Sequence, residues 1–109
     1  MATEQEVTRL VVRALDRLNA ARDPDEPKVD SSLETRLFGE DGALDSLDLV
    51  RLVVITEQLI EDSYEVQVSL ADDTAMSMED NPFRTVAVFA AFATRLLNAA
   101  LDKSRPVDA

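Results

Sequence analysis

The clearest pattern of apolar and polar positions lies near the N-terminus, over residues 3–22. Six apolar residues recur there at intervals of three and four, which places them on one face of an amphipathic helix: Val7, Leu10, Val11, Ala14, Leu15 and Leu18. Thr3 followed by Glu6 matches a capping box at a helix start, and Pro24 ends the pattern. We therefore predict a first helix that packs this face onto a core.

A second helical pattern covers residues 46–61. Its core face holds Leu49, Leu52, Val53, Thr56, Leu59 and Ile60. Four more residues carry the apolar character further round the helix: Leu47, Val50, Val54 and Ile55. Such a helix is either almost fully buried or presents part of its surface to a partner. The run 53–55 consists of β-branched residues, so a strand at this point stays an alternative.

A last helix is predicted over residues 82–101, because Asn81 is a favourable cap and Pro82 suits the first helical position. Its core face would hold Val86, Phe89, Ala90, Ala93, Leu96 and Leu97. We expect the tail at 103–109 to be flexible, which leaves a single domain over residues 3–102.

The connection between the first two helices is long, running over residues 23–45. Ser31 and Glu34 could cap one helical turn within it. Three apolar residues would pin that turn onto the core: Leu33, Leu37 and Phe38. Gly39 and Gly42 are the only glycines of the chain, and their position predicts a backbone that turns tightly just before residue 46.

The segment 63–81 alternates apolar with polar residues at its start, at Tyr64, Val66, Val68 and Leu70. We read it as an extended segment that packs alternate side chains on the helices. A short helical turn is predicted at 73–79, with Met76 and Met78 partly buried. Together the patterns predict an all-α fold: a small bundle of three main helices plus one short helix, with a long first loop.

Composition limits the chemistry that this chain can perform. It has neither cysteine nor histidine, which excludes disulfides and thiolate metal sites and removes the commonest general base. The remaining candidates for an enzyme are carboxylates, of which Glu40, Asp41, Asp45 and Asp48 lie near one loop. They lack the spacing of an EF-hand loop. We therefore predict a protein that is not an enzyme and binds no metal.

Charge and hydropathy indicate where the protein works. Acidic residues outnumber basic ones by 22 to 11, and the net charge is −11. Such a surface repels nucleic acid and favours partners with basic patches, although it also simply keeps a small protein soluble. The longest apolar stretch, Val86–Ala93, is far shorter than the roughly 20 residues of a membrane span. We expect a cytoplasmic monomer without a membrane span.

The tripeptide Asp45-Ser46-Leu47 stands at the start of the second helical pattern. It resembles the D-S-L motif of acyl carrier proteins, and the order of predicted helices and loops resembles that family over most of the chain. The resemblance implies that the Ser46 hydroxyl carries covalent 4′-phosphopantetheine. In that family a magnesium-dependent phosphopantetheinyl transferase attaches the group from coenzyme A.

The position of Ser46 also has a purely structural interpretation. Serine is a favoured N-cap residue, so Ser46 could simply cap the second helix. The same position suits modification, because unsatisfied backbone N–H groups and the helix dipole stabilise a phosphate at a helix start. The chain has no base to activate the hydroxyl, which fits a serine on which another enzyme acts.

The resemblance also implies a partner-binding set around the serine: Asp45, Leu47, Asp48, Arg51, Val54 and Glu57. Leu47 and Val54 match apolar positions that partner enzymes grip, although Leu47 could instead be a core leucine. The three carboxylates would meet basic docking patches; a solvated helix face is the alternative for Glu57. Many carriers have a glutamate where this chain has Arg51, and a glycine nearer the motif than Gly42. Arg51 argues against docking on the standard fatty-acid enzymes, whereas the displaced glycine and a longer connection between the second and last helices indicate a specialised carrier.

The resulting hypothesis is a discrete acyl carrier protein. It would shuttle thioester-linked acyl groups between loading and processing enzymes of a fatty-acid, polyketide or specialised biosynthetic pathway. An aminoacyl or D-alanyl carrier would use the same Ser46 and stays an alternative. An unmodified acidic helical adaptor, which binds a partner through residues 47–55, is an alternative of a different class.

Overall fold

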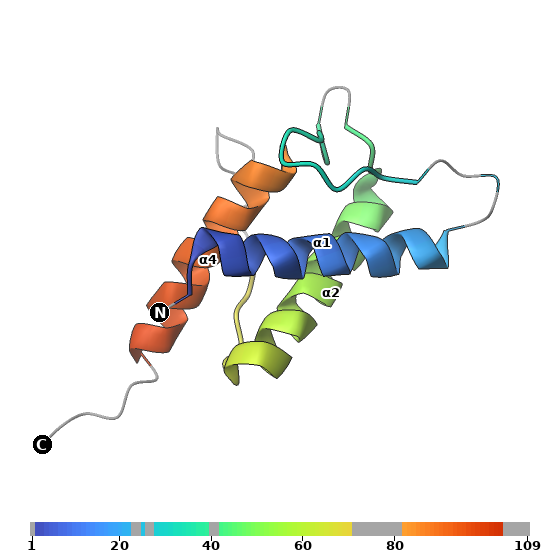
Figure 1. Cartoon of the computed structure of the whole chain (residues 1–109). Coiled ribbons are helices and arrows are strands. Elements are labelled where there is room, and N and C mark those ends of the chain that lie inside the picture. Colours follow the sequence, from blue (N-terminus) through green and yellow to red (C-terminus); the bar gives the residue numbers. More distant parts are fainter. Residues whose placement is uncertain (1, 23–24, 26–27, 40–41, 71–81, 104–109) are drawn as a thin grey trace, which may run out of the picture.

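The computed structural model describes residues 2–22, 25, 28–39, 42–70 and 82–103. Three helices account for most of this part of the chain (Figure 1): α1 (Glu4–Ala21), α2 (Ser46–Tyr64) and α4 (Val86–Lys103). The described residues form no strand, only an isolated antiparallel bridge between Arg36 and Thr85. The predicted all-α class is therefore confirmed.

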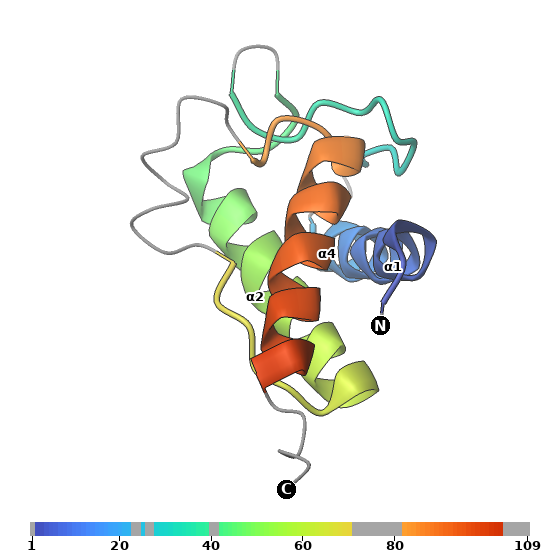
Figure 2. The same cartoon turned by 90° about the vertical axis from the view of Figure 1, so that its left-hand side faces the viewer.

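The long helix α1 lies across the other two helices (Figure 1), and Figure 2 looks almost along its axis. Both α2 and α4 begin beneath the long first loop and run toward the opposite end of the molecule. Each packs against α1 more extensively than against the other. The N-terminus is tied to α4, since Asn98 bonds both the N–H and the carbonyl of Ala2. No helix of the described part is long and apolar enough to cross a membrane.

The N-terminal helix forms as the sequence predicts. Thr3 is its N-cap, and the Thr3 hydroxyl accepts a hydrogen bond from the Glu6 N–H at 3.2 Å. The helix ends at Ala21, before the proline-containing segment. All six predicted core residues are buried: Val7, Leu10, Val11, Ala14, Leu15 and Leu18.

The second helix also buries the predicted face, which consists of Leu49, Leu52, Val53, Thr56, Leu59 and Ile60. The alternative of a strand at 53–55 is therefore wrong. The helix continues past residue 61 to Tyr64 and ends where Glu65 adopts a left-handed conformation, with φ of 58°. The extended segment that follows packs Val66 and Val68 partly, and Leu70 fully, against the core, as its alternation predicts.

The last helix begins at Val86, so the predicted start at Pro82 is wrong. The carbonyls of Phe83 and Arg84 accept hydrogen bonds from the N–H groups of Phe38 and Leu37, respectively, in the first loop. Those carbonyls are therefore not used in a helix, and the Thr85 hydroxyl instead caps the Val88 N–H at 3.1 Å. At its other end the helix includes Lys103, which was expected to begin the tail. Residues 104–109 lie outside the described part.

The core of this last helix differs in detail from the prediction. Val86, Phe89, Ala90, Ala93 and Leu97 are buried as predicted, whereas Leu96 is only partly buried. Phe92 and Thr94 are also buried, and Phe83, Phe89 and Phe92 form a cluster of tilted and edge-on rings. The short helical turn predicted at 73–79, with Met76 and Met78, lies outside the described residues.

Two of the three apolar residues predicted to anchor the first loop pack on the core. Leu37 is fully buried and Phe38 partly buried, as predicted, but Leu33 is 51% exposed and does not pin the loop. The Gly42 N–H donates to the Gly39 carbonyl at 3.0 Å, and a Cβ on Gly42 would lie 2.8 Å from the Leu37 carbonyl oxygen. The tight turn predicted from the two glycines is therefore confirmed.

Candidate functional site

Ser46 is the first residue of α2, and its side chain is exposed. The N-cap is Asp45, whose carboxylate accepts a hydrogen bond from the Asp48 N–H at 2.8 Å. The interpretation of Ser46 as the N-cap is therefore wrong, because the aspartate before it takes that position. The Ser46 hydroxyl is left without a capping role and open to solvent.

The backbone on either side of Ser46 is firmly anchored. Leu44 and Leu49 are both buried, and they occupy the two positions of a hydrophobic staple around the N-cap. The Leu44 N–H donates to the Leu37 carbonyl at 2.8 Å, and the Leu37 N–H donates to the Arg84 carbonyl at 2.8 Å. The start of α2 is thus connected through the first loop to the start of α4.

Asp48, one turn after the cap, points back to the end of α1. Its carboxylate contacts the Arg22 guanidinium at 2.7 Å, and the two side chains are only 13% and 10% exposed. Because the pair is largely shielded, the Arg22 charge offsets that of Asp48 within the molecule. A role of Asp48 toward basic partners stays a prediction; its structural role is to join α1 to α2.

A row of exposed apolar side chains follows the serine along α2. Leu47 is 59% exposed, Val50 56% and Val54 44%, and we call these three residues the apolar stripe. Their spacing of three and four places them on one side of the helix. The alternative of Leu47 as a core residue is wrong. Val50 was not among the predicted site residues, although its spacing from Leu47 could have identified it.

Arg51 lies on the same side of α2 as the apolar stripe, four residues after Leu47 and three before Val54. Its side chain is exposed and forms no hydrogen bond or ion pair with any part of the chain that the structure describes. A free cation thus lies among the exposed apolar residues.

Glu57 lies one turn beyond the stripe and is half-buried. Its carboxylate accepts a hydrogen bond from the Leu70 N–H at 2.7 Å, which holds the extended segment against α2. Next to it, a groove of about 480 Å³ lies between α2 and this segment, lined by Val54, Glu57, Gln58, Glu61, Gln67, Val68 and Ser69. Among the described residues that line it, two are carboxylates and none is a cation, so this part of the groove is acidic.

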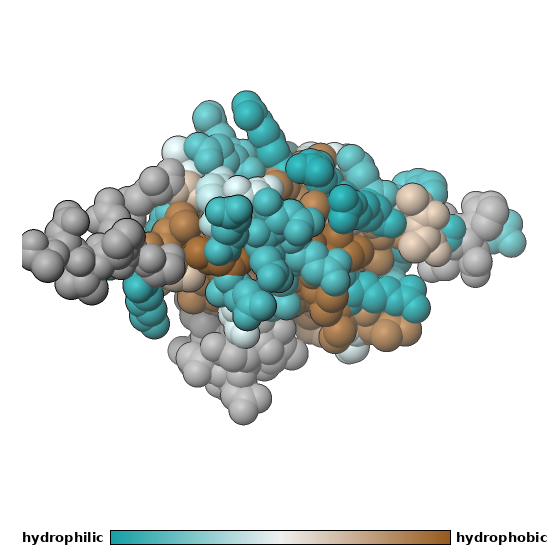
Figure 3. All heavy atoms as spheres, turned by 90° about the horizontal axis from the view of Figure 1, so that it is seen from below, coloured by the Kyte–Doolittle hydropathy of each residue, from teal (hydrophilic) through white to brown (hydrophobic). Residues whose placement is uncertain are grey.

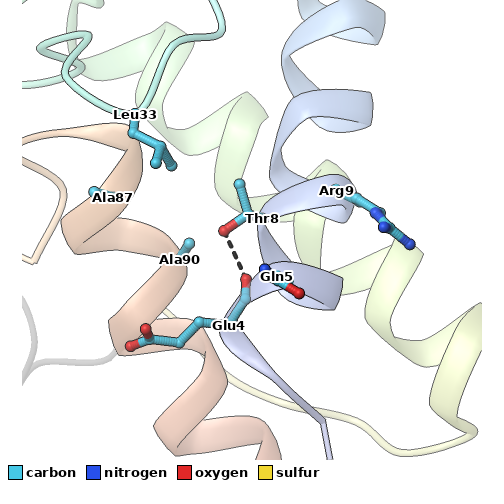
Figure 4. A pocket seen from close by; sticks show the side chains of 7 residues that line it. All are labelled: Glu4, Gln5, Thr8, Arg9, Leu33, Ala87 and Ala90. Carbon is cyan, nitrogen blue, oxygen red and sulfur yellow. Dashed lines mark hydrogen bonds between the residues drawn. The ribbon is translucent and has the colours of Figure 1, made fainter.

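A second hollow lies on another side of the molecule, between α1, α4 and the first loop (Figure 4). It has a volume of about 440 Å³ and is lined by Glu4, Gln5, Thr8, Arg9, Leu33, Ala87 and Ala90. The Thr8 hydroxyl is already used, because it donates to the Glu4 carbonyl at 2.6 Å. This hollow is separate from Ser46, which is not among its lining residues.

The surface seen from below carries apolar residues in patches between polar ones (Figure 3). Among the described residues, no group of three or more carboxylates is placed to hold a metal ion. The pKa of one described residue, Tyr64, is clearly shifted. Partial burial and the Glu6 carboxylate, which accepts a hydrogen bond from the Tyr64 hydroxyl at 2.7 Å, raise the pKa of Tyr64 to about 12.

The geometry around Ser46 therefore combines an exposed hydroxyl, an anchored helix start and exposed apolar side chains. Comparisons of the chain with protein-family models, curated proteins and solved structures found no match.

Proposed function

We propose that the protein is a discrete acyl carrier that bears 4′-phosphopantetheine on Ser46. The observation that carries the proposal is the exposure of the Ser46 hydroxyl at the first position of α2, directly beside the apolar stripe. A transferase can reach this hydroxyl, and a partner enzyme can contact Leu47 while it acts on a group attached there. The resemblance of Asp45-Ser46-Leu47 to the carrier motif indicates which group is attached to the hydroxyl, namely 4′-phosphopantetheine.

The start of α2 suits a phosphodiester on Ser46. In the part of the chain described here, the backbone N–H groups of Ser46 and Leu47 have no hydrogen-bond partner, as expected for the first turn of a helix. These donors and the helix dipole stabilise a negative charge next to the serine. Arg22 supports the same effect, because it offsets the charge of Asp48 one turn away.

The attached group would supply a flexible arm that ends in a thiol, which holds an acyl group as a thioester. The chain itself contributes a fixed point of attachment and a surface for recognition. Leu44 and Leu49 hold the start of α2 in place, while the exposed apolar stripe offers a small contact area. A small contact of this kind favours brief association, which a shuttle between enzymes requires.

Ser46→Ala tests the attachment directly. The wild-type protein, incubated with coenzyme A, Mg²⁺ and a broad-specificity phosphopantetheinyl transferase, should gain the mass of one phosphopantetheine group, measured on the intact protein. Ser46→Ala should gain none. Ser63→Ala is the matched control, because Ser63 is an exposed serine in the last turn of the same helix. That variant should be modified at the wild-type rate.

The far-ultraviolet circular dichroism of Ser46→Ala should equal that of the wild type, because Asp45 caps α2. An unmodified wild-type protein, in a reaction where a known carrier is modified, would contradict the proposal. Modification of Ser46→Ala would show that another residue is the acceptor.

The apolar stripe also supports a second candidate, an unmodified adaptor that binds a partner through α2. Exposed apolar side chains at helical spacing are the usual contacts of such a surface. The two candidates differ in their dependence on the hydroxyl. An adaptor would form the same stoichiometric complex with or without Ser46→Ala, whereas a carrier loses its function.

A further inference from the structure

The part of α2 that follows Ser46 is not uniformly acidic, although the chain has a net charge of −11. Between the N-cap and Val54, the charged side chains on α2 are Asp45, Asp48 and Arg51. Asp48 is offset by Arg22 at 2.7 Å. Among the described residues of this stretch, the Asp45 carboxylate, which caps the helix, and the Arg51 guanidinium therefore remain without a counter-charge, and their charges are opposite. We call this part of α2, residues 45–54, the docking face.

Arg51 occupies a particular place on the docking face. One helical turn separates it from Leu47 on one side and from Val54 on the other, and both are exposed. A partner that covers the apolar stripe must therefore also cover the guanidinium. Removing a charged group from water without a counter-charge is costly, so the partner must supply an acceptor, and a carboxylate matches a guanidinium best.

The next part of α2 has the opposite charge. Glu57 and Glu61 line the groove beside the extended segment, and Glu61 also accepts a weak hydrogen bond from Gln67 at 3.4 Å. These carboxylates lie six and ten residues beyond Arg51, which corresponds to about 9 and 15 Å along the helix axis. The outward side of α2 thus changes from a cation near Ser46 to carboxylates near its end.

We propose that the partner of this protein is an enzyme whose docking surface places an apolar recess over the stripe and a carboxylate opposite Arg51, with basic groups only toward Glu57 and Glu61. This inference rests on the proposed carrier function and specifies the partner of the same site. Enzymes that dock carriers on a uniformly basic patch fit the docking face poorly, because their cations would meet Arg51. Charge complementarity of this kind selects among partners that share one apolar contact.

Charge reversal at Arg51 tests the inference. The probe is a ketosynthase that docks carriers on a basic patch, and the measured quantity is its dissociation constant for the holo-protein at low salt. Arg51→Glu should bind roughly tenfold more tightly than the wild type, and Arg51→Ala should lie between them. Arg13→Glu changes the net charge by the same amount at an exposed site on α1, and it should leave the dissociation constant within about twofold.

A second arm uses the same ketosynthase with its basic docking residues changed to glutamate. The order should reverse, so that the wild-type carrier binds this variant more tightly than Arg51→Glu does. The reversal shows that the docking residues of the partner sense the charge at residue 51, and Arg13→Glu, which should leave both dissociation constants nearly unchanged, separates this pairing from an effect of net charge.

The possible failures are distinguishable because loading is measured first, by intact mass. A protein that takes no phosphopantetheine overturns the proposed function and this inference with it. A loaded protein whose affinity for the basic ketosynthase is unchanged or weakened by Arg51→Glu overturns this inference alone. An equal gain in Arg51→Glu and Arg13→Glu would do the same, because the effect would then come from net charge.

Discussion

The two sides of α2 carry the same kinds of residue and have opposite surroundings. On the inner side, Leu49, Leu52 and Val53 are at most 3% exposed. On the outer side, Leu47, Val50 and Val54 are between 44% and 59% exposed. Leucine and valine thus serve as core on one side and as free surface on the other, within two turns of one helix.

The place of a residue around α2 decides its role, because α1 covers only one side of this helix. The inner residues contribute to stability, since their apolar surface is removed from water. The outer residues keep their surface exposed, at a cost in solubility that a functional contact would justify. Three experiments measure how differently the two sides of α2 and its end respond to substitution.

The largest difference in the free energy of unfolding is expected between Leu52→Ala and Leu47→Ala. Leu52 is fully buried, so its truncation should lower the free energy of unfolding by about 2–5 kcal/mol through lost burial and a cavity. Leu47→Ala removes the same atoms from an exposed site and should change the free energy of unfolding by less than about 0.5 kcal/mol. Urea denaturation of the two variants measures both values. Similar losses in the two variants would show that Leu47 packs in the core in solution.

A smaller difference in the free energy of unfolding is expected between substitutions of Arg22, which contacts α2, and of Arg51, which lies on it. Arg22→Met leaves the largely shielded Asp48 carboxylate without its counter-charge and should cost about 1–3 kcal/mol of unfolding free energy. Arg51→Met at its exposed site should change the value by less than about 0.5 kcal/mol.

Adding Asp48→Asn to Arg22→Met should recover part of that loss, because the unpaired buried charge is then gone. Denaturation of the single and double variants forms a double-mutant cycle. Purely additive losses would contradict the coupling of the two side chains.

The smallest effect concerns Tyr64, which lies between the two sides at the end of α2. Burial and the Glu6 carboxylate raise its pKa from 10.0 to about 12, so folding favours the neutral phenol. Its contribution to stability is therefore complete below pH 10 and is lost as the pH rises through about 12. Because the chain has a single tyrosine, phenolate absorbance reports this pKa directly.

Glu6→Gln should lower the pKa of Tyr64 toward its ordinary value, because it removes the nearby negative charge while leaving a group that can accept a hydrogen bond. A Tyr64 pKa near 10 in the folded wild-type protein would show that the contact between Tyr64 and Glu6 does not persist in solution.

Much of the fold could be predicted from local patterns. The apolar spacing in α1 and α2 identified their buried residues, because a helix that packs on a core must place apolar side chains every three or four positions. The alternation at 66–70 identified the extended segment for the equivalent reason, although Tyr64, its predicted first residue, belongs to α2. Gly39 and Gly42 marked the tight turn, since a Cβ on Gly42 would meet the backbone of Leu37.

The errors arose where contacts between distant residues decided the outcome. Pro82 suited a helix start, but hydrogen bonds from the first loop delayed α4 to Val86. Leu33 was predicted to anchor the first loop together with Leu37 and Phe38, yet only the other two pack on the core. Ser46 and Asp45 are both good caps by type, and the backbone path between Leu44 and Leu49 gave the position to Asp45.

The sequence by itself determined the helices, their core faces and the motif around Ser46, because these depend on neighbours within a few residues along the chain. Only the tertiary structure decided the electrostatics of that site. Asp48 is offset by Arg22 because α1 ends beside the start of α2, and Arg51 stays free because no described element covers the outer side. Charge balance at a surface depends on distances between residues far apart in the chain, which no local pattern contains.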